Sequence, residues 1–133
     1  MSSIVNAFSN KDACAAALEQ VSERQLEMVA LVEAWSKINS GSRNLVGLDT
    51  MEAEIVKAFE PLGAEVAYIQ LPDGEMVNAK GQVETMKNGR CIRIFKRPTA
   101  NRKVLLTGHT DTVFAVDHPF QAPKYLDDIT LNG

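Results

Sequence analysis

Long hydrophobic runs are missing from this 133-residue chain, which places limits on its location. No window approaches the roughly 18 consecutive apolar residues of a membrane span. The first twenty residues, MSSIVNAFSNKDACAAALEQ, contain polar breaks where a signal peptide would be continuously apolar. We therefore expect a cytoplasmic protein with no membrane partner.

Cysteine and positive charge are also scarce. The two cysteines, Cys14 and Cys91, lie far apart in the sequence, and a reducing compartment would keep them as thiols without a catalytic role. Fourteen Lys and Arg residues against seventeen Asp and Glu residues give a net charge of -3, without the basic stripe that nucleic-acid binding requires. No glycine-rich segment has the spacing of a P-loop. Nucleic acids and nucleotides are therefore not the expected partners.

The remaining composition is that of an ordinary globular protein. Hydrophobic residues make up 45% of the chain and charged residues 23%, which argues against disorder. The length suits one domain with a real core. The sequence contains no internal repeat and no interdomain linker.

Helical patterns fill the N-terminal half. Residues 9–38 predict two helices or one kinked helix, with a possible capping box formed by Ser22 and Gln25. The loop NSGSRN, residues 39–44, ends this region. A third helix is predicted from about Asp49 to Leu62, with Asp49 or Thr50 as its cap and Gly63 just past its end. The apolar positions expected to face inward are Leu26, Val29, Val32, Trp35 and Ile38 in the second helical piece, and Met51, Ile55, Val56, Phe59 and Leu62 in the third helix.

Strand patterns follow Gly63. Residues 64–71 and 89–97 alternate with period two, while residues 103–108, KVLLTG, are apolar on both faces, as in a central strand covered on both sides. Asn88-Gly89 is a turn signal that could lead directly into the second strand. The predicted fold class is α/β, with N-terminal helices packed on a mixed β-sheet.

A histidine follows the third predicted strand. Ligand sites in open α/β sheets lie beyond the carboxyl ends of the strands, which is the position of His109. Asp111 lies two residues further on and therefore on the same side of an extended segment. A metal-binding histidine commonly donates its other ring N–H to a carboxylate or carbonyl, so His109 and Asp111 have the order of a metal ligand and its supporting carboxylate.

The order of these segments resembles a known enzyme family. The helical N-terminus, SGSRN, FEPLGAEV and VLLTGHTDTVF occur in the order seen in the N-terminal part of the two-zinc metallopeptidases that include aminoacylase, acetylornithine deacetylase and glutamate carboxypeptidase. The resemblance covers nearly the whole chain. Its most specific part, residues 108–114, is most similar to the glutamate carboxypeptidase branch.

The resemblance implies a function and a set of roles. His109 would be a zinc ligand and Asp111 the catalytic-site carboxylate that positions it. Two zinc ions, with Co²⁺ or Mn²⁺ as possible substitutes, would activate a shared water and polarise the amide carbonyl of a small peptide or N-acyl amino acid. The family's remaining ligands and its general base have no counterpart before Gly133. We therefore expect residues 1–133 to be the N-terminal portion of a hydrolase catalytic domain, inactive alone.

Other readings of these residues stay open. His118 could complete a site with His109 and Asp117, but a surface or structural role is favoured. Asp127-Asp128 is better explained as a solvated turn. Arg43 in SGSRN could hold a substrate carboxylate. The alternative to an enzyme is a non-catalytic α/β module that binds a partner. An unpaired sheet edge would favour self-association, so we expect a homo-oligomer.

Overall fold

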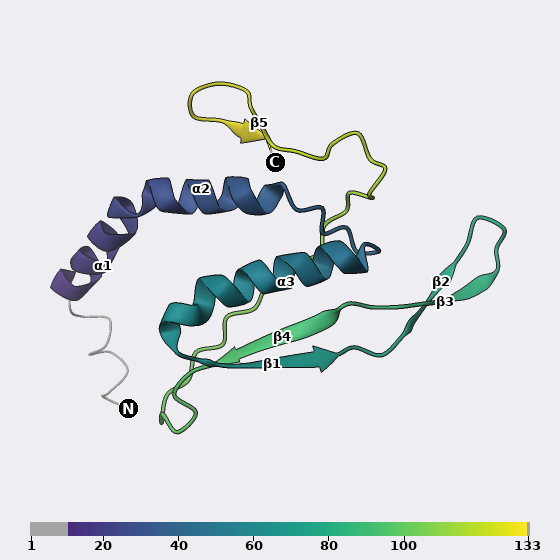
Figure 1. Ribbon diagram of the computed structural model, residues 1–133. Coiled ribbons are helices and arrows are strands. Elements are labelled where there is room, and N and C mark those ends of the chain that lie inside the picture. The colour runs from purple at the N-terminus through teal and green to yellow at the C-terminus, as the bar shows by residue number, and fades with distance from the viewer. Residues whose placement is uncertain (1–10, 133) are drawn as a thin grey trace. The chain divides into compact units, whose positions relative to one another are not determined.

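The computed structural model describes residues 11–132, which contain both helices and strands (Figure 1). The chain divides into two compact units, the first ending at Ala34 and the second beginning at Trp35, and each is described by itself. The helices are α1 (Lys11–Glu23), α2 (Gln25–Ser36), α3 (Leu45–Phe59) and the short 3₁₀ helix η2 (Glu60–Leu62). In the described residues, no helix has both the length and the apolar character to cross a membrane.

Of the two alternatives predicted for residues 9–38, the described part has two helices, α1 and α2, but the predicted capping box is wrong. Ser22 lies in the last turn of α1, where its hydroxyl donates to the carbonyl of Leu18 at 3.0 Å. A hydroxyl bonded back to the preceding turn does not cap the next helix. Instead, Arg24 lies between the helices and pairs with Glu27 in the first turn of α2 at 2.9 Å.

Helix α3 starts four residues earlier than predicted, and its cap is Asn44 rather than Asp49 or Thr50. The Asn44 side chain accepts a hydrogen bond from the backbone N–H of Gly47 at 3.1 Å, as an N-cap does. Gly63 at the far end adopts φ 55° and ends η2 in the left-handed conformation, as predicted.

The strands form two-stranded antiparallel sheets. The predicted strands at residues 64–71 and 89–97 are confirmed, and Glu65–Gln70 pairs with Arg90–Phe95. The strands are β1 (Glu65–Gln70), β2 (Gly74–Val77), β3 (Val83–Met86), β4 (Arg90–Phe95), β5 (Lys124–Tyr125) and β6 (Leu131–Asn132), paired as β1 with β4, β2 with β3, and β5 with β6. The α/β class is therefore confirmed, but all the strand ladders among the described residues are antiparallel, in place of one mixed sheet.

The β2–β3 hairpin was not predicted. Asn88-Gly89 is not a tight turn that leads directly into β4, the second of the predicted strands. The β2–β3 hairpin occupies the interval between β1 and β4 (Figure 1). Asn88 instead lies where the two ladders meet, and its side-chain amide donates to the carbonyl of Pro72 at 2.7 Å. The turn signal thus marks an interruption in a long two-stranded ribbon.

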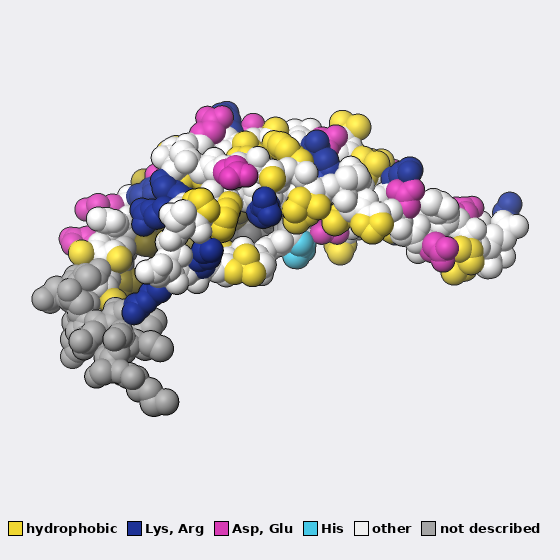
Figure 2. Space-filling view, turned by 90° about the horizontal axis from the view of Figure 1, so that it is seen from below, with side chains coloured by type: hydrophobic (Ala, Val, Ile, Leu, Met, Phe, Trp, Pro, Cys, Tyr) yellow, Lys and Arg dark blue, Asp and Glu magenta, His cyan; other side chains and the backbone are white. Residues whose placement is uncertain are grey.

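The predicted central strand at residues 103–108 is wrong. This segment is in no strand, and its apolar side chains Val104, Leu105 and Leu106 are 87%, 85% and 87% exposed. A strand that is apolar on both faces is stable only with neighbours that cover it, and the described residues supply none. Figure 2 shows hydrophobic side chains spread among charged ones on the face that it displays.

The core of the second unit lies between α3 and the ribbon. Helix α3 contacts β4 (Figure 1). The buried apolar side chains among the described residues are Leu48 and Met51. Glu52 is buried beside them at 2% exposure and pairs with Arg90 at 2.7 Å. Of the other residues predicted to face inward from this helix, Ile55 and Val56 are half-buried, whereas Phe59 and Leu62 are exposed.

Candidate functional site

The candidate site joins two segments that are far apart in the sequence. Gly41 and Thr112 form an isolated parallel bridge. The backbone N–H of Ser42 donates to the carbonyl of Thr112 at 3.0 Å, and the N–H of Thr112 donates to the carbonyl of Ser40 at 2.9 Å. These bonds bring the loop after α2 alongside the residues that follow His109.

Asn39 and Asn44 connect this junction to the start of α3. The side-chain amide of Asn44 donates to the carbonyl of Asn39 at 2.7 Å. The amide nitrogen of Asn39 lies 3.0 Å from the side-chain oxygen of Gln121 and 3.3 Å from the carbonyl of Phe114. One loop therefore caps the helix and also holds the segment that carries the candidate ligand.

The ring of His109 is oriented by Asp111. Its Nδ1 atom lies 2.8 Å from the backbone carbonyl oxygen of Asp111 and 3.2 Å from its carboxylate Oδ1. Both oxygens are acceptors, so in the neutral ring Nδ1 carries the proton and Nε2 keeps its lone pair. The side chain is 84% exposed. His109 thus has the tautomer of a ligand that binds metal through Nε2, with the supporting residue predicted from the sequence.

Asp111 is held in turn by Ser42. The Ser42 hydroxyl donates to Asp111 Oδ2 at 2.6 Å, and this bond is the main reason that the pKa of Asp111 is lowered. Partial burial opposes this effect, while the residue's own backbone N–H and His109 add to it. The sequence showed Ser42 only as part of a polar loop, in which Arg43 was the residue considered for binding. Arg43 is exposed.

His118 has a different environment. Its Nδ1 accepts a hydrogen bond from the backbone N–H of Phe120 at 3.1 Å, so the neutral ring carries its proton on Nε2. The ring packs at 4.9 Å from the ring of Phe114, which in turn lies 5.0 Å from that of Phe120. These contacts and the exposure of His118 fit a surface or structural role.

The second aspartate candidate lies in a turn. Asp127 accepts hydrogen bonds from the N–H of Ile129 at 2.9 Å and from the hydroxyl of Thr130 at 3.0 Å, and both lower its pKa, the N–H more strongly. Its carboxylate therefore serves as a hydrogen-bond acceptor within the β5–β6 turn. This geometry agrees with the turn interpretation of Asp127-Asp128.

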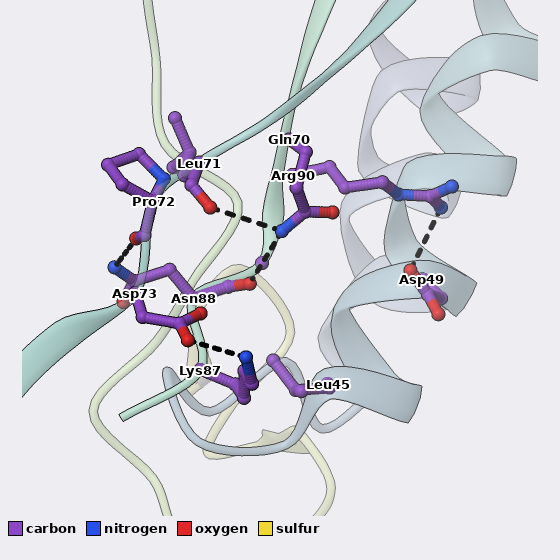
Figure 3. Close-up of a pocket in the computed structure, with 10 residues that line it drawn as sticks. Leu45, Asp49, Gln70, Leu71, Pro72, Asp73, Lys87, Asn88 and Arg90 are labelled. Carbon is purple, nitrogen blue, oxygen red and sulfur yellow. Dashed lines mark hydrogen bonds and ion pairs between the residues drawn. The ribbon is translucent and has the colours of Figure 1, made fainter. Parts of the chain in front are cut away.

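A pocket of about 550 Å³ lies elsewhere, between the start of α3 and the junction of the two ladders (Figure 3). Its charged side chains pair with one another, Lys87 with Asp73 and Arg90 with Asp49. The amide of Gln70 donates to the carbonyls of Leu71 and Asn88. Because these polar groups already form ion pairs and hydrogen bonds within the protein, the pocket is a weaker candidate for ligand binding than the surface at His109.

His109 is the candidate metal ligand among the described residues. Its Nε2 atom is one candidate ligand atom, and between residues 11 and 132 no three His, Cys, Asp or Glu side chains gather as a metal-binding group. Comparison with protein-family models, curated proteins and solved structures found no match to this chain. The geometry around His109 is therefore the basis for a functional proposal.

Proposed function

We propose that this chain contributes a zinc ligand, His109, to a metal-dependent hydrolase that cleaves amide bonds in small peptides or N-acyl amino acids. The observation that supports the proposal is the placement of His109 Nδ1 against two oxygens of Asp111, at 2.8 and 3.2 Å. This arrangement leaves Nε2 directed away from its partner and accessible to a metal. The sequence resemblance to two-zinc metallopeptidases supplies the reaction class.

Asp111 would act on the metal ligand His109 and would not contact the substrate. Bound zinc would supply Lewis-acid polarisation and an acidified water. Asp111 keeps the His109 proton on Nδ1 and restricts rotation of the ring, as partners of metal-binding histidines do. A zinc site uses about three or four protein ligands. The proposal therefore requires ligands beyond His109, and we expect the 133-residue chain alone to be inactive.

A non-catalytic binding module is the second candidate. The observation that favours it is the exposure of Val104, Leu105 and Leu106, which form an apolar surface suited to a protein partner. The two candidates differ in what they require of His109. Only the hydrolase needs its Nε2 atom to bind a metal.

Zinc titration followed by the ¹⁵N signals of the histidine rings tests the hydrolase proposal. Cys14 and Cys91 are free and exposed, and thiolates bind zinc well, so the titration uses a variant with both changed to serine. We expect weak, saturable binding that shifts Nε2 of His109 and leaves His118 unchanged at the same zinc concentrations. His109→Ala should abolish this binding in calorimetry. Equal effects on both histidines, or no effect on His109, would contradict the proposal.

A further inference from the structure

Ser42 contacts Asp111, the residue that orients the candidate ligand His109. Its hydroxyl donates to Asp111 Oδ2 at 2.6 Å, while the other carboxylate oxygen, Oδ1, lies 3.2 Å from His109 Nδ1. The two oxygens of one carboxylate thus contact two different side chains. A rotation of the carboxylate that breaks the first contact also moves Oδ1 away from the imidazole.

The position of Ser42 is fixed by its backbone. Its N–H bonds to the carbonyl of Thr112 at 3.0 Å, next to the parallel bridge between Gly41 and Thr112. A Cβ atom on Gly41 would lie 2.3 Å from the carbonyl oxygen of Phe114, so the two segments approach as closely as a glycine allows. The backbone framework therefore holds the hydroxyl over Asp111, and the hydroxyl also lies within hydrogen-bond distance of the carbonyl of Thr112, at 3.2 Å.

We infer that Ser42 is a positioning residue for the metal site, which holds the Asp111 carboxylate in the orientation that orders His109. The inference rests on the proposed function, because it assigns Ser42 a role in metal binding through His109. Partners of metal-binding histidines typically contribute ~10–100-fold to metal affinity. Ser42 acts one contact further out, so we expect its loss to weaken zinc binding about threefold to tenfold.

The test compares Ser42→Ala and Ser42→Thr in the full chain that carries both cysteine-to-serine changes. Two quantities are measured at one pH, the zinc affinity from the His109 Nε2 signal and the χ1 rotamer populations of Asp111 from NMR coupling constants. Ser42→Ala should weaken zinc binding and average the Asp111 rotamers. Ser42→Thr retains the hydroxyl and should restore both.

The outcomes separate the two proposals. The parent chain is the one that carries only the two cysteine-to-serine changes. If it binds zinc at His109 and Ser42→Ala binds zinc equally well, the positioning role is wrong while the proposed function stands. Averaged Asp111 rotamers with unchanged zinc affinity would also overturn the inference, since Ser42 would then only stabilise the loop. If the parent chain does not bind zinc at His109, the proposed function fails and the role of Ser42 fails with it.

Discussion

Gly41 lies directly against the carbonyl group of Phe114, where a Cβ atom would be 2.3 Å from the oxygen. These residues belong to the two segments that meet at the candidate site. The approach is closer than any side chain permits, so the glycine is required by packing. Its backbone also takes part in the bridge to Thr112, which makes this contact a direct link between the fold and the site.

Gly41→Ala should therefore separate the two segments. The added methyl group meets backbone rather than a flexible side chain, so we expect a loss of about 1–3 kcal/mol in the free energy of unfolding. The contact between Ser42 and Asp111 should be lost as well. Denaturant unfolding measures the first effect and NMR chemical shifts of Asp111 the second. Gly108→Ala is the matched control, because a Cβ atom there meets nothing within 4 Å; an equal loss in both variants would refute the packing argument.

Arg90→Ala should lower the free energy of unfolding more than most other substitutions in β4. It would leave the carboxylate of Glu52, which is 2% exposed, without its partner at 2.7 Å. It would also remove the contacts of Arg90 with Asp49 and with the ring of Tyr68. Removing one partner of a buried ion pair costs ~3–5 kcal/mol, and the partial exposure of Arg90 favours the lower end.

Thermal or denaturant unfolding of Arg90→Ala and Arg93→Ala provides the comparison. Arg93 is an exposed residue of the same strand, and its loss should change the free energy of unfolding by no more than about 0.5 kcal/mol. Similar values for the two variants would show that the Glu52 carboxylate does not depend on Arg90.

The bond from Ser42 predicts how pH affects Asp111. The pKa of Asp111 is lowered in the folded chain, so its contribution to stability is present above the unfolded value of about 3.9 and is lost as pH falls through the folded pKa. Ser42→Ala should raise the pKa of Asp111 in a ¹³C carboxyl titration. Asp127, whose pKa is lowered chiefly by the N–H of Ile129, should be unaffected. An unchanged Asp111 titration would show that another contact lowers its pKa.

The exposed segment at residues 103–108 predicts self-association. Leu105 is 85% exposed within an extended apolar stretch, and such segments tend to pair with another chain. Leu105→Lys should shift the chain toward monomer in light scattering at high concentration. Val77→Lys, at an exposed site in the β2–β3 hairpin, should leave the oligomer unchanged. If the unsubstituted chain is a monomer at the same concentration, the expectation of self-association is wrong.

Local patterns in the sequence were sufficient to predict some elements but not others. The alternation in residues 64–71 and 89–97 identified β1 and β4, because period two is a property of the strand itself. The segment at 103–108 has an equally strong apolar pattern, but a buried strand depends on neighbours that a local pattern does not reveal. The start of α3 was missed because the cap formed by Asn44 precedes an apolar first turn.

The candidate site shows the same limit. His109 and Asp111 are two residues apart, so their relation could be inferred from the geometry of an extended chain. Ser42 is 69 positions from Asp111, and only the folded loop brings its hydroxyl within 2.6 Å. A polar residue in a serine- and glycine-rich loop carries no signal of such a long-range contact.

The most direct test of this account is the tautomer of His109 in the metal-free chain, measured by long-range ¹H–¹⁵N correlation at a pH where both histidines are neutral. The account predicts that His109 carries its proton on Nδ1, facing Asp111, and that His118 carries its proton on Nε2. Asp111→Ala should reduce the preference at His109 without changing His118. A His109 ring protonated on Nε2 would contradict the account, because the atom proposed to bind zinc would then be a hydrogen-bond donor.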